Sequence, residues 1–266
     1  MQIRKTNYFL EIKRFLFSIN ALLYRELTTR ISRSTIGLLG VFVEPSITLL
    51  VFIAIFSLRR GSDVFGLNIY IFLTAGISIF SLFNSIAYRS ANAIDANQSL
   101  IGTYKYIKII DTVIARSIIE FFLSLIFLIV ILSSVFLYIS QIVLSSIHLS
   151  ISILFLSLTF SFGVGLIILV VSNLYPITKL ILPFITRPLF IASGVFFPLL
   201  SIPQGLRKYL LWNPILHFIE LFRNSFDNNY PLDKMISISY AFYSATTTLV
   251  IGLGLYFLFE NELLKK

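Results

Sequence analysis

The sequence contains no cysteine and carries little charge. Without cysteine, a disulfide framework and a thiolate metal site are both excluded. Charged residues make up 12% of the 266 residues and hydrophobic residues make up 57%, whereas a soluble domain carries about 25% charged residues. So little polar surface cannot cover a core of this size in water. The composition therefore predicts an integral membrane protein.

Motifs that carry catalysis are also missing. None of the twelve glycines lies in a G-x-x-x-x-G-K-[ST] phosphate-binding loop, and neither an H-E-x-x-H nor a G-x-S-x-G motif occurs. The two histidines, His148 and His217, have no companion at a spacing that suits a metal ion. We therefore expect no catalytic residue, no cofactor and no metal site, and ATP hydrolysis only in a separate partner subunit.

Long hydrophobic runs dominate the chain. A hydrocarbon core of about 30 Å needs roughly 20 residues at about 1.5 Å each, and the runs lack the alternation of a membrane β-barrel. The predicted fold is an all-α integral membrane protein with six transmembrane helices, at residues 37–58, 67–88, 117–139, 149–171, 177–199 and 238–259. Two glycine pairs within the spans predict close helix packing: Gly163 with Gly165, and Gly252 with Gly254.

The basic residues are distributed unevenly. Most lie in residues 1–36, in the connection 89–116 and at the C-terminal tail, which six spans place on one side of the membrane. The positive-inside bias puts both termini in the cytoplasm, and Arg59 with Arg60 is a minor exception. The net charge of +9 is then explained by topology and attraction to anionic lipid, and a nucleic-acid partner is not expected.

Residues 1–36 form a cytoplasmic leader before the transmembrane domain, residues 37–266. Charges interrupt the leader throughout, which excludes a signal peptide and a span. Apolar residues recur at spacings of three and four, which predicts an amphipathic helix along the membrane interface: Phe9, Ile12, Leu16, Ile19, Leu23, Leu27 and Ile31. Two interpretations stay open, a simple anchor or a helix whose Arg25, Glu26 and Arg30 hold a cytoplasmic partner.

The connection 89–116 is longer than two neighbouring spans require. Its middle is polar and weakly charged, with apolar residues that suit docking in a cleft. Spacing alone fits equally well a short helix presented to a soluble partner and an ordinary solvated loop.

The external segment 200–237 predicts two short helices between spans five and six. Residues 205–211 suit the first helix, and Asn213–Pro214 breaks it. A second amphipathic helix follows, with an apolar stripe of Ile215, Phe218, Ile219 and Phe222, and with Glu220, Arg223 and Asn224 away from it. The pattern indicates a re-entrant or interfacial hairpin, which serves either as a gate over a translocation path or as a surface lid.

Charges inside spans cost about 2.5–3.5 kcal/mol each, so each needs an explanation. Glu44, followed by Pro45, suits a kink that faces the bundle interior. Glu120 lies one turn after Arg116, which predicts a local ion pair. Arg187 precedes Pro188 near the middle of a span, so we expect it to face a carboxylate or a polar path.

Several short fragments together resemble a known family. They are Leu-Tyr-Arg-Glu-Leu-Thr-Thr-Arg at residues 23–30, Gly-Leu-Leu-Gly at 37–40, Glu-Pro at 44–45, Ala-Ile-Asp-Ala-Asn-Gln at 93–98, Asp-Thr-Val-Ile-Ala-Arg at 111–116, Phe-Pro at 197–198, Ser-Ile-Pro at 201–203 and Leu-Trp-Asn-Pro at 211–214. Their order is similar to that of capsule polysaccharide export permeases of the ABC-2 transporter superfamily, over residues 23–223. Residues 102–106 depart from the pattern, because an Arg-Pro or similar break is expected after an aromatic there. The shape of the coupling segment is therefore open.

The resemblance implies a homodimer served by two cytoplasmic ATP-binding-cassette subunits. It implies export of a lipid-linked capsular polysaccharide across the bacterial inner membrane, with a periplasmic co-polymerase or adaptor and an outer-membrane exporter as further partners. Coupling to the ATPase is expected at Arg25, Glu26, Arg30, Ile94, Asp95, Asn97, Gln98, Leu100 and Tyr104. Glu44 and Arg187 are expected on the translocation path. The external gate is expected at Phe196, Phe197, Pro198, Trp212, Asn213 and Pro214.

Two alternatives remain. A related ABC-2 permease would move O-antigen, teichoic acid or a small lipophilic compound. A membrane-embedded glycan-processing enzyme or a secondary carrier is disfavoured, since the chain lacks catalytic clusters and any visible inverted repeat.

Overall fold

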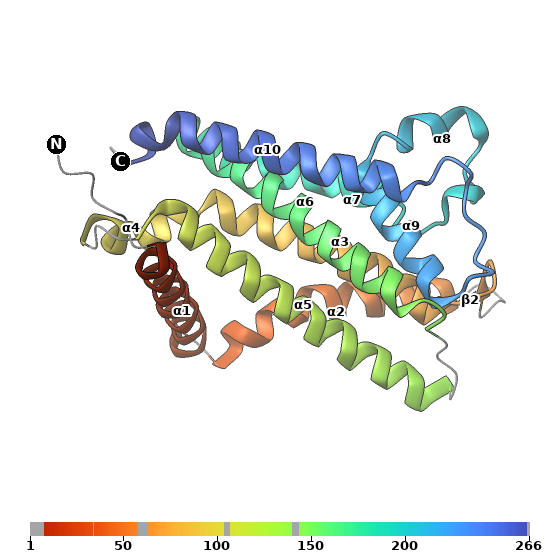
Figure 1. Ribbon diagram of the computed structural model, residues 1–266. Helices are drawn as coiled ribbons and strands as arrows, with labels where there is room; N and C mark the ends of the chain where they lie inside the picture. Colours follow the sequence, from red (N-terminus) through yellow and green to blue (C-terminus); the bar gives the residue numbers. More distant parts are fainter. Residues whose placement is uncertain (1–7, 34, 58–62, 104–106, 140–143, 265–266) are drawn as a thin grey trace.

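The computed structural model describes residues 8–33, 35–57, 63–103, 107–139 and 144–264 of the chain. These residues are nearly all helical (Figure 1). The helices are α1 (Tyr8–Arg33), α2 (Thr35–Ser57), α3 (Ile69–Ala91), α4 (Ala93–Thr103), α5 (Ile109–Ile139), α6 (Ile147–Leu174), α7 (Ile177–Ala192), α8 (Gln204–Leu210), α9 (Pro214–Phe226) and α10 (Ile238–Leu263). A 3-10 turn at Leu199–Ser201 and a two-stranded antiparallel hairpin, β1 (Asp63–Val64) and β2 (Leu67–Asn68), complete the described fold.

Four of the described helices are long and apolar enough to cross a membrane: α3, α5, α6 and α10. They coincide with four of the six predicted spans, and α5 begins at Ile109 rather than at residue 117. The first predicted span lies in α2, of which Phe42–Phe56 forms a shorter apolar helix.

The fifth predicted span is too long. It was expected to run to residue 199, but α7 ends at Ala192, and its 16 residues cover only about 24 Å at about 1.5 Å per residue. The helix ends because Gly194 has a positive φ of 70°, a conformation that glycine adopts without strain. A Cβ at Gly194 would also lie 2.6 Å from Leu216 Cδ1. A glycine in this position, directly after the C-cap residue Ser193, is a common end of a helix.

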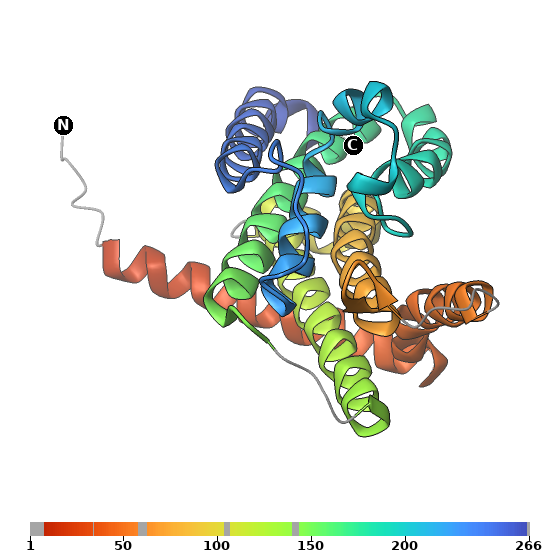
Figure 2. The same cartoon turned by 90° about the vertical axis from the view of Figure 1, so that its right-hand side faces the viewer.

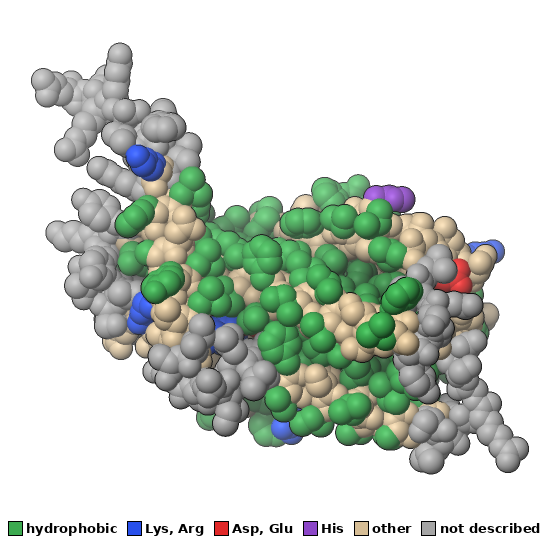
Figure 3. All heavy atoms as spheres, turned by 90° about the horizontal axis from the view of Figure 1, so that it is seen from below, with side chains coloured by type: hydrophobic (Ala, Val, Ile, Leu, Met, Phe, Trp, Pro, Cys, Tyr) green, Lys and Arg blue, Asp and Glu red, His purple; other side chains and the backbone are tan. Residues whose placement is uncertain are grey.

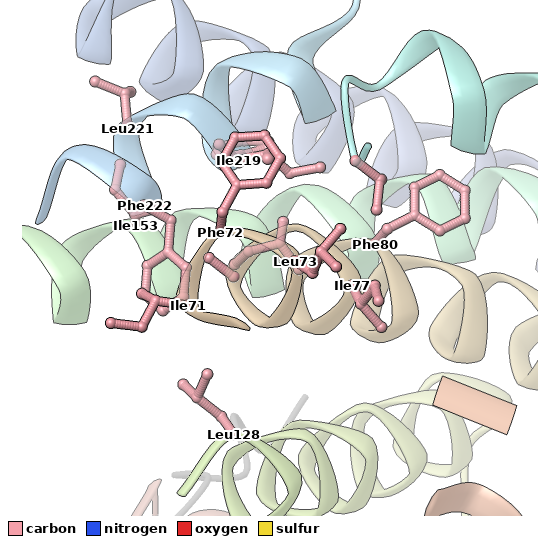
Figure 4. Packing of buried hydrophobic residues seen from close by; sticks show 14 of the residues in the cluster. Ile71, Phe72, Leu73, Ile77, Phe80, Leu128, Ile153, Ile219, Leu221 and Phe222 are labelled. Carbon is pink, nitrogen blue, oxygen red and sulfur yellow. The ribbon is translucent and has the colours of Figure 1, made fainter. Parts of the chain in front are cut away.

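Helix α3 lies at the centre of the bundle. It packs against α2, α5, α6, α7 and α9, and most of its side chains are buried. Figure 4 shows Phe72, Leu73 and Ile77 of α3 among side chains of α9, α6 and α5. An apolar helix buried nearly all round gains from burial on every face, so α3 is the element against which the others are placed.

Helices α6 and α10 approach each other very closely. A Cβ at Gly163 would lie 2.5 Å from the backbone nitrogen of Leu249, and one at Gly252 would lie 2.5 Å from the carbonyl oxygen of Gly163. Gly165 leaves room for Ser90 of α3 in the same way. The predicted role of these glycines in close packing is confirmed, but at Gly254 it is wrong, because nothing lies within 4 Å of a Cβ there.

The two ends of the bundle differ. Helix α1 runs across one end, beside α4, and α10 ends toward the same end of the bundle, whereas the β-hairpin, α8 and α9 lie toward the opposite end (Figure 1). We call these the α1 end and the α8 end. Between them, hydrophobic side chains cover most of the face seen in Figure 3, and exposed apolar residues continue along α5 and α10 (Ile129, Phe136, Val250 and Leu258). Such a surface suits contact with lipid.

Candidate functional site

A cavity of about 840 Å³ lies on one side of the bundle, between α2 and α7. Helix α3 lies between these two helices, as the view along the bundle shows (Figure 2). Residues of α1, α4 and α5 close the cavity at the α1 end. We call it the central cavity.

The α3 side of the central cavity is polar. Ser81, Asn84, Ser85 and Tyr88 of α3 all line it, because spacings of three and four residues place side chains on one helical face. These side chains are half-buried in a helix otherwise packed with apolar residues. Polar groups on a membrane helix are found where they face a cavity or a partner, so this face indicates a polar path.

Both residues predicted to lie on a translocation path line the central cavity. Glu44 belongs to α2 and Arg187 to α7, and both side chains are exposed on its walls. Glu44 borders this cavity, whereas Pro45 and Leu49 form the buried face of α2. Thr48, one turn later, donates a hydrogen bond of 2.8 Å to the Glu44 carbonyl.

Five residues form an ionic cluster at the α1 end of the cavity: Glu26, Arg30, Arg89, Arg116 and Glu120. Glu26 pairs with Arg30 across one turn of α1 at 3.2 Å and with Arg116 of α5 at 3.3 Å. Glu120 of α5 pairs with Arg30 at 2.8 Å and with Arg89 of α3. The predicted pair of Glu120 with Arg116 is wrong, because α1 crosses α5 and places Glu26 beside Arg116. We call these residues the α1-end cluster.

The α1-end cluster attaches α1 to the bundle by its charged face. Burial acts to raise the pKa of Glu26, but Arg116 and Arg30 outweigh it, so that this pKa lies below its ordinary value. Ile19 and Leu22 are buried beside these charges, whereas Leu16 and Leu27 are exposed. The predicted apolar stripe is therefore divided between the bundle and the outer surface, and α1 carries apolar residues on both faces.

Helix α4 is the middle of the predicted coupling segment, and it is a helix rather than an irregular loop. Asp95 pairs with Lys179 of α7 at 2.6 Å. The Asn97 side-chain oxygen accepts a hydrogen bond of 2.8 Å from Arg25 of α1. Helix α4 is therefore fastened to both α1 and α7.

The remaining coupling residues lie in different surroundings. Ile94 is buried against the bundle and Gln98 is exposed. Tyr104 and the side chain of Leu100 lie outside the described residues. Asn97 is also buried, so among the described coupling residues of α4 the exposed ones are Asp95 and Gln98.

Aromatic rings border the central cavity toward the α8 end. Phe80 of α3 and Phe190 of α7 line the cavity, with ring centroids 4.8 Å apart. Phe196, a predicted gate residue, contacts Phe190 at 4.7 Å and stacks on Phe52 of α2 at 3.5 Å. The polar cavity is thus followed by a row of rings that joins α2, α3 and the residues after α7.

The predicted helix break at Asn213–Pro214 is confirmed. Helix α8 ends at Leu210, and α9 begins at Pro214. The Asn213 side chain caps α9 by accepting from the Ile215 amide at 3.0 Å, and it donates to Ser193 Oγ at 2.9 Å. Trp212 is 80% exposed, and its carbonyl accepts a hydrogen bond of 2.8 Å from Tyr240. Phe197 and Pro198 follow Phe196 before the 3-10 turn, and Pro198 is buried.

The buried charges of α9 were missed by the sequence reasoning. Glu220 and Arg223, expected on a polar face, are 1% and 0% exposed. Their contacts with each other and with Tyr230 make them a second ionic group, which we call the α9 cluster. Arg223 pairs with Glu220 at 3.1 Å, and Glu220 accepts from the Tyr230 hydroxyl at 3.1 Å. A Glu–Arg pair three residues apart in an otherwise apolar helix was the available signal.

Arg223 binds the segment that follows α7. Its guanidinium donates to the carbonyls of Gly194 at 2.9 Å, Val195 at 2.7 Å and Phe72 at 3.2 Å, and it lies 3.5 Å from the centre of the Phe72 ring. Gly76 makes room, since a Cβ there would lie 2.8 Å from Arg223 Nη2. Helix α9 is thereby joined to α3 and to the end of α7.

The central cavity is lined by many polar and charged side chains. In the described part of the chain no group of three or more His, Asp or Glu is placed to hold a metal ion. Five arginines and two glutamates line the central cavity: Arg25, Arg30, Arg89, Arg116, Arg187, Glu26 and Glu44. An excess of cations beside polar side chains suits an anionic or strongly hydrated solute.

Comparison with known proteins identifies relatives over most of the chain. Residues 18–226 match the family described as ABC-2 type transporter. The chain is 34% identical to a polysialic acid transport protein, KpsM, of Escherichia coli, over 93% of this chain and 95% of that protein. It is 31% identical to a capsule polysaccharide export inner-membrane protein, CtrC, of Neisseria meningitidis, over 77% of each. It is 28% identical to another protein of that description, BexB, of Haemophilus influenzae, over 78% of each.

Proposed function

This chain belongs to the ABC-2 type transporter family, and we propose from that premise that it is the transmembrane permease of an ATP-driven exporter of capsular polysaccharide. The observation that carries the proposal is the match to the polysialic acid transport protein across 93% of this chain. The capsule export proteins CtrC and BexB match it as well. The protein is a multi-pass membrane protein, and the bacterial inner membrane is its place of action.

The proposed topology has six spans, both termini in the cytoplasm and a re-entrant hairpin at α8 and α9. Helices α3, α5, α6 and α10 supply four spans. Helices α2 and α7 flank the central cavity and supply the other two, with the residues after α7 completing the crossing. The α1 end faces the cytoplasm, which fits the basic residues near it. The exposed apolar side of α1 (Leu16, Phe17, Tyr24 and Leu27) then lies against the membrane interface.

ATP hydrolysis is assigned to a cytoplasmic partner subunit that docks on α4. Helix α4 lies at the α1 end (Figure 1) and contacts both α1 and α7 through Arg25–Asn97 and Lys179–Asp95. A displacement of α4 is therefore transmitted to two helices that border the central cavity. Two such ATPase subunits serve a homodimer of this chain. A periplasmic co-polymerase or adaptor and an outer-membrane exporter complete the assembly.

The translocation path is proposed at the central cavity, enclosed between two copies. The cavity is lined by residues of both α2 and α7, and these two helices flank one side of the bundle (Figure 2). A polar groove facing lipid is costly, and a second copy on this side removes that cost. The substrate is a lipid-linked polysaccharide, and the excess of arginine over glutamate along the cavity suits an acidic one. The row of rings from Phe80 to Phe196 and the hairpin beyond it act as the external gate.

The test is deletion of the gene followed by measurement of polysaccharide on and inside the cell. Export predicts loss of surface capsule together with intracellular accumulation of lipid-linked polymer, and restoration by the wild-type gene. Loss of surface polymer without accumulation would indicate synthesis, as for a glycan-processing enzyme, and would contradict the proposal. Intact capsule with loss of O-antigen, teichoic acid or a small lipophilic compound from the surface would assign the permease to that cargo instead.

A further inference from the structure

We propose that Glu44 of one copy forms an ion pair with Arg187 of a second copy, so that each central cavity is completed by a charge from the partner. This inference rests on the homodimer of the proposed function. It adds a specific contact, which fixes the side of the bundle that faces the partner and makes α2 and α7 the helices that meet across the interface.

Both charges lack a counter-ion in the described part of the chain. Every ion pair described there involves other residues, and the Glu44 and Arg187 side chains are both exposed. They belong to helices of a membrane protein, where an unpaired charge costs about 2.5–3.5 kcal/mol on insertion scales. The flanking residues Val43 and Ile47 of α2 are apolar and exposed, which suits contact with lipid or with a second copy of the chain.

The helices turn both charges toward the open side of the cavity. Thr186 is buried, and its hydroxyl lies 3.5 Å from that of Tyr88 on α3. Arg187 is the next residue and is rotated by about 100° around α7, away from α3. On α2, Pro45 and Leu49 are buried while Glu44 is exposed. No described ion pair joins the two charges within this chain.

The two charges are complementary under twofold symmetry. In a C2 interface the same surface meets itself, so that if residue i contacts residue j of the partner, j also contacts i of the partner. Helices α2 and α7 flank one side of the bundle (Figure 2), and they carry opposite charges on that side. When a second copy binds this side of the bundle with twofold symmetry, α2 of each copy meets α7 of the other. The same ion pair then forms twice.

The absence of cysteine from the sequence makes a direct test possible. Glu44→Cys and Arg187→Cys are placed in separately tagged copies, co-expressed with the ATPase partner, and treated in native membranes with a short bis-maleimide. We expect a cross-linked product that carries both tags. The matched control is Leu50→Cys with Arg187→Cys, because Leu50 is also exposed on α2 but lies more than one turn away. We expect no cross-link from that pair.

Two outcomes would overturn the pairing. One is cross-linking only when both cysteines are in the same copy, which would indicate contact within one chain. The other is equal cross-linking of the Leu50→Cys control, which would indicate random collision. If the two tags do not co-purify at all, the homodimer itself is contradicted. None of these readouts requires capsule export, so failure of the proposed substrate leaves the cross-linking result unaffected.

Charge exchange gives an independent readout. Glu44→Arg and Arg187→Glu are each expected to lower surface capsule on the order of tenfold or more, since each leaves two like charges facing each other. The double variant Glu44→Arg/Arg187→Glu restores the pair with the signs reversed and is expected to recover most of the export. A double variant as defective as the single ones, at equal protein level, would contradict the pairing.

Discussion

The two ionic groups of this protein are built in opposite ways. In the α9 cluster, Arg223 and Glu220 are almost completely buried and lie on one helix. Arg223 donates to the backbone carbonyls of Gly194 and Val195, and Glu220 accepts from the Leu199 amide. The α1-end cluster distributes two glutamates and three arginines over α1, α3 and α5, beside an open cavity. In the α1-end cluster each glutamate is shared by two arginines: Glu26 pairs with Arg30 and Arg116, and Glu120 pairs with Arg30 and Arg89.

Removing the charge of Arg223 should have the largest effect. Arg223→Met leaves the carbonyls of Gly194 and Val195 and the Glu220 carboxylate without their donor. Breaking a buried ion pair costs about 3–5 kcal/mol, so we expect a large loss of thermal stability and of membrane-inserted protein. Thermal unfolding of the purified protein in detergent measures it. The control is Lys234→Met, an exposed lysine, which should behave as wild type. If the Arg223→Met protein had normal stability, the hydrogen bonds from Arg223 to the residues after α7 would not be important for the fold.

A single change in the α1-end cluster should cost less. Glu120→Gln removes the partner of Arg30 and Arg89, but Arg30 keeps Glu26. We expect destabilisation of about 1–3 kcal/mol and easier proteolytic release of α1. The same unfolding measurement, with limited proteolysis, tests this. If Glu120→Gln lowered the stability as much as Arg223→Met, the two clusters would contribute equally to the fold. That result would contradict the difference proposed between them.

The Asp95–Lys179 pair should matter little for stability and more for export. Asp95 is exposed, and exposed ion pairs contribute about 0.2–1 kcal/mol. We expect Lys179→Met to leave the melting temperature nearly unchanged and to lower the capsule exported per ATP hydrolysed, because α4 loses its link to α7. The charge exchange Asp95→Lys/Lys179→Asp should recover export. Unaltered export in Lys179→Met would show that α4 acts through α1 alone.

Acidification should produce the smallest effect, limited to α1. The pKa of Glu26 is lowered in the folded protein, so its contribution to stability is present above the unfolded value of about 4.3 and is lost as the pH falls through the folded pKa. We expect α1 to become protease-sensitive below about pH 4.3 in the wild type. In Glu26→Gln this pH dependence should disappear. An identical pH profile in both proteins would assign the effect to another carboxylate.

The sequence predicts what depends on local patterns. Spans corresponding to α3, α6 and α10 were found because their apolar runs are long, and the break at Asn213–Pro214 was found because proline and a capping asparagine act locally. The end of α7 was misplaced because the apolar run continues past Gly194, although Gly194 has a positive φ and no room for a side chain beside Leu216. The partner of Glu120 was misassigned because it comes from α1, ninety residues earlier.

The part of the site that depends on local sequence patterns was also predicted. Glu44 and Arg187 stood out as charges in apolar runs, and both lie on the central cavity. The burial of Arg223 depends on Gly76 and on carbonyls from two other segments, which no single stretch of sequence displays. Roles for the coupling and gate residues stay predictions.

The contact between Gly163 and Gly252 limits how the protein can move. The main chains of α6 and α10 approach closely there, and a side chain at either glycine would push the two helices apart, so we expect α6 and α10 to move as one unit. On the proposed function, we expect the passage to widen instead at the stacked rings of Phe52 in α2 and Phe196, which follows α7. Stacked rings can separate and re-form without unfolding a helix, which fits their proposed role as the external gate.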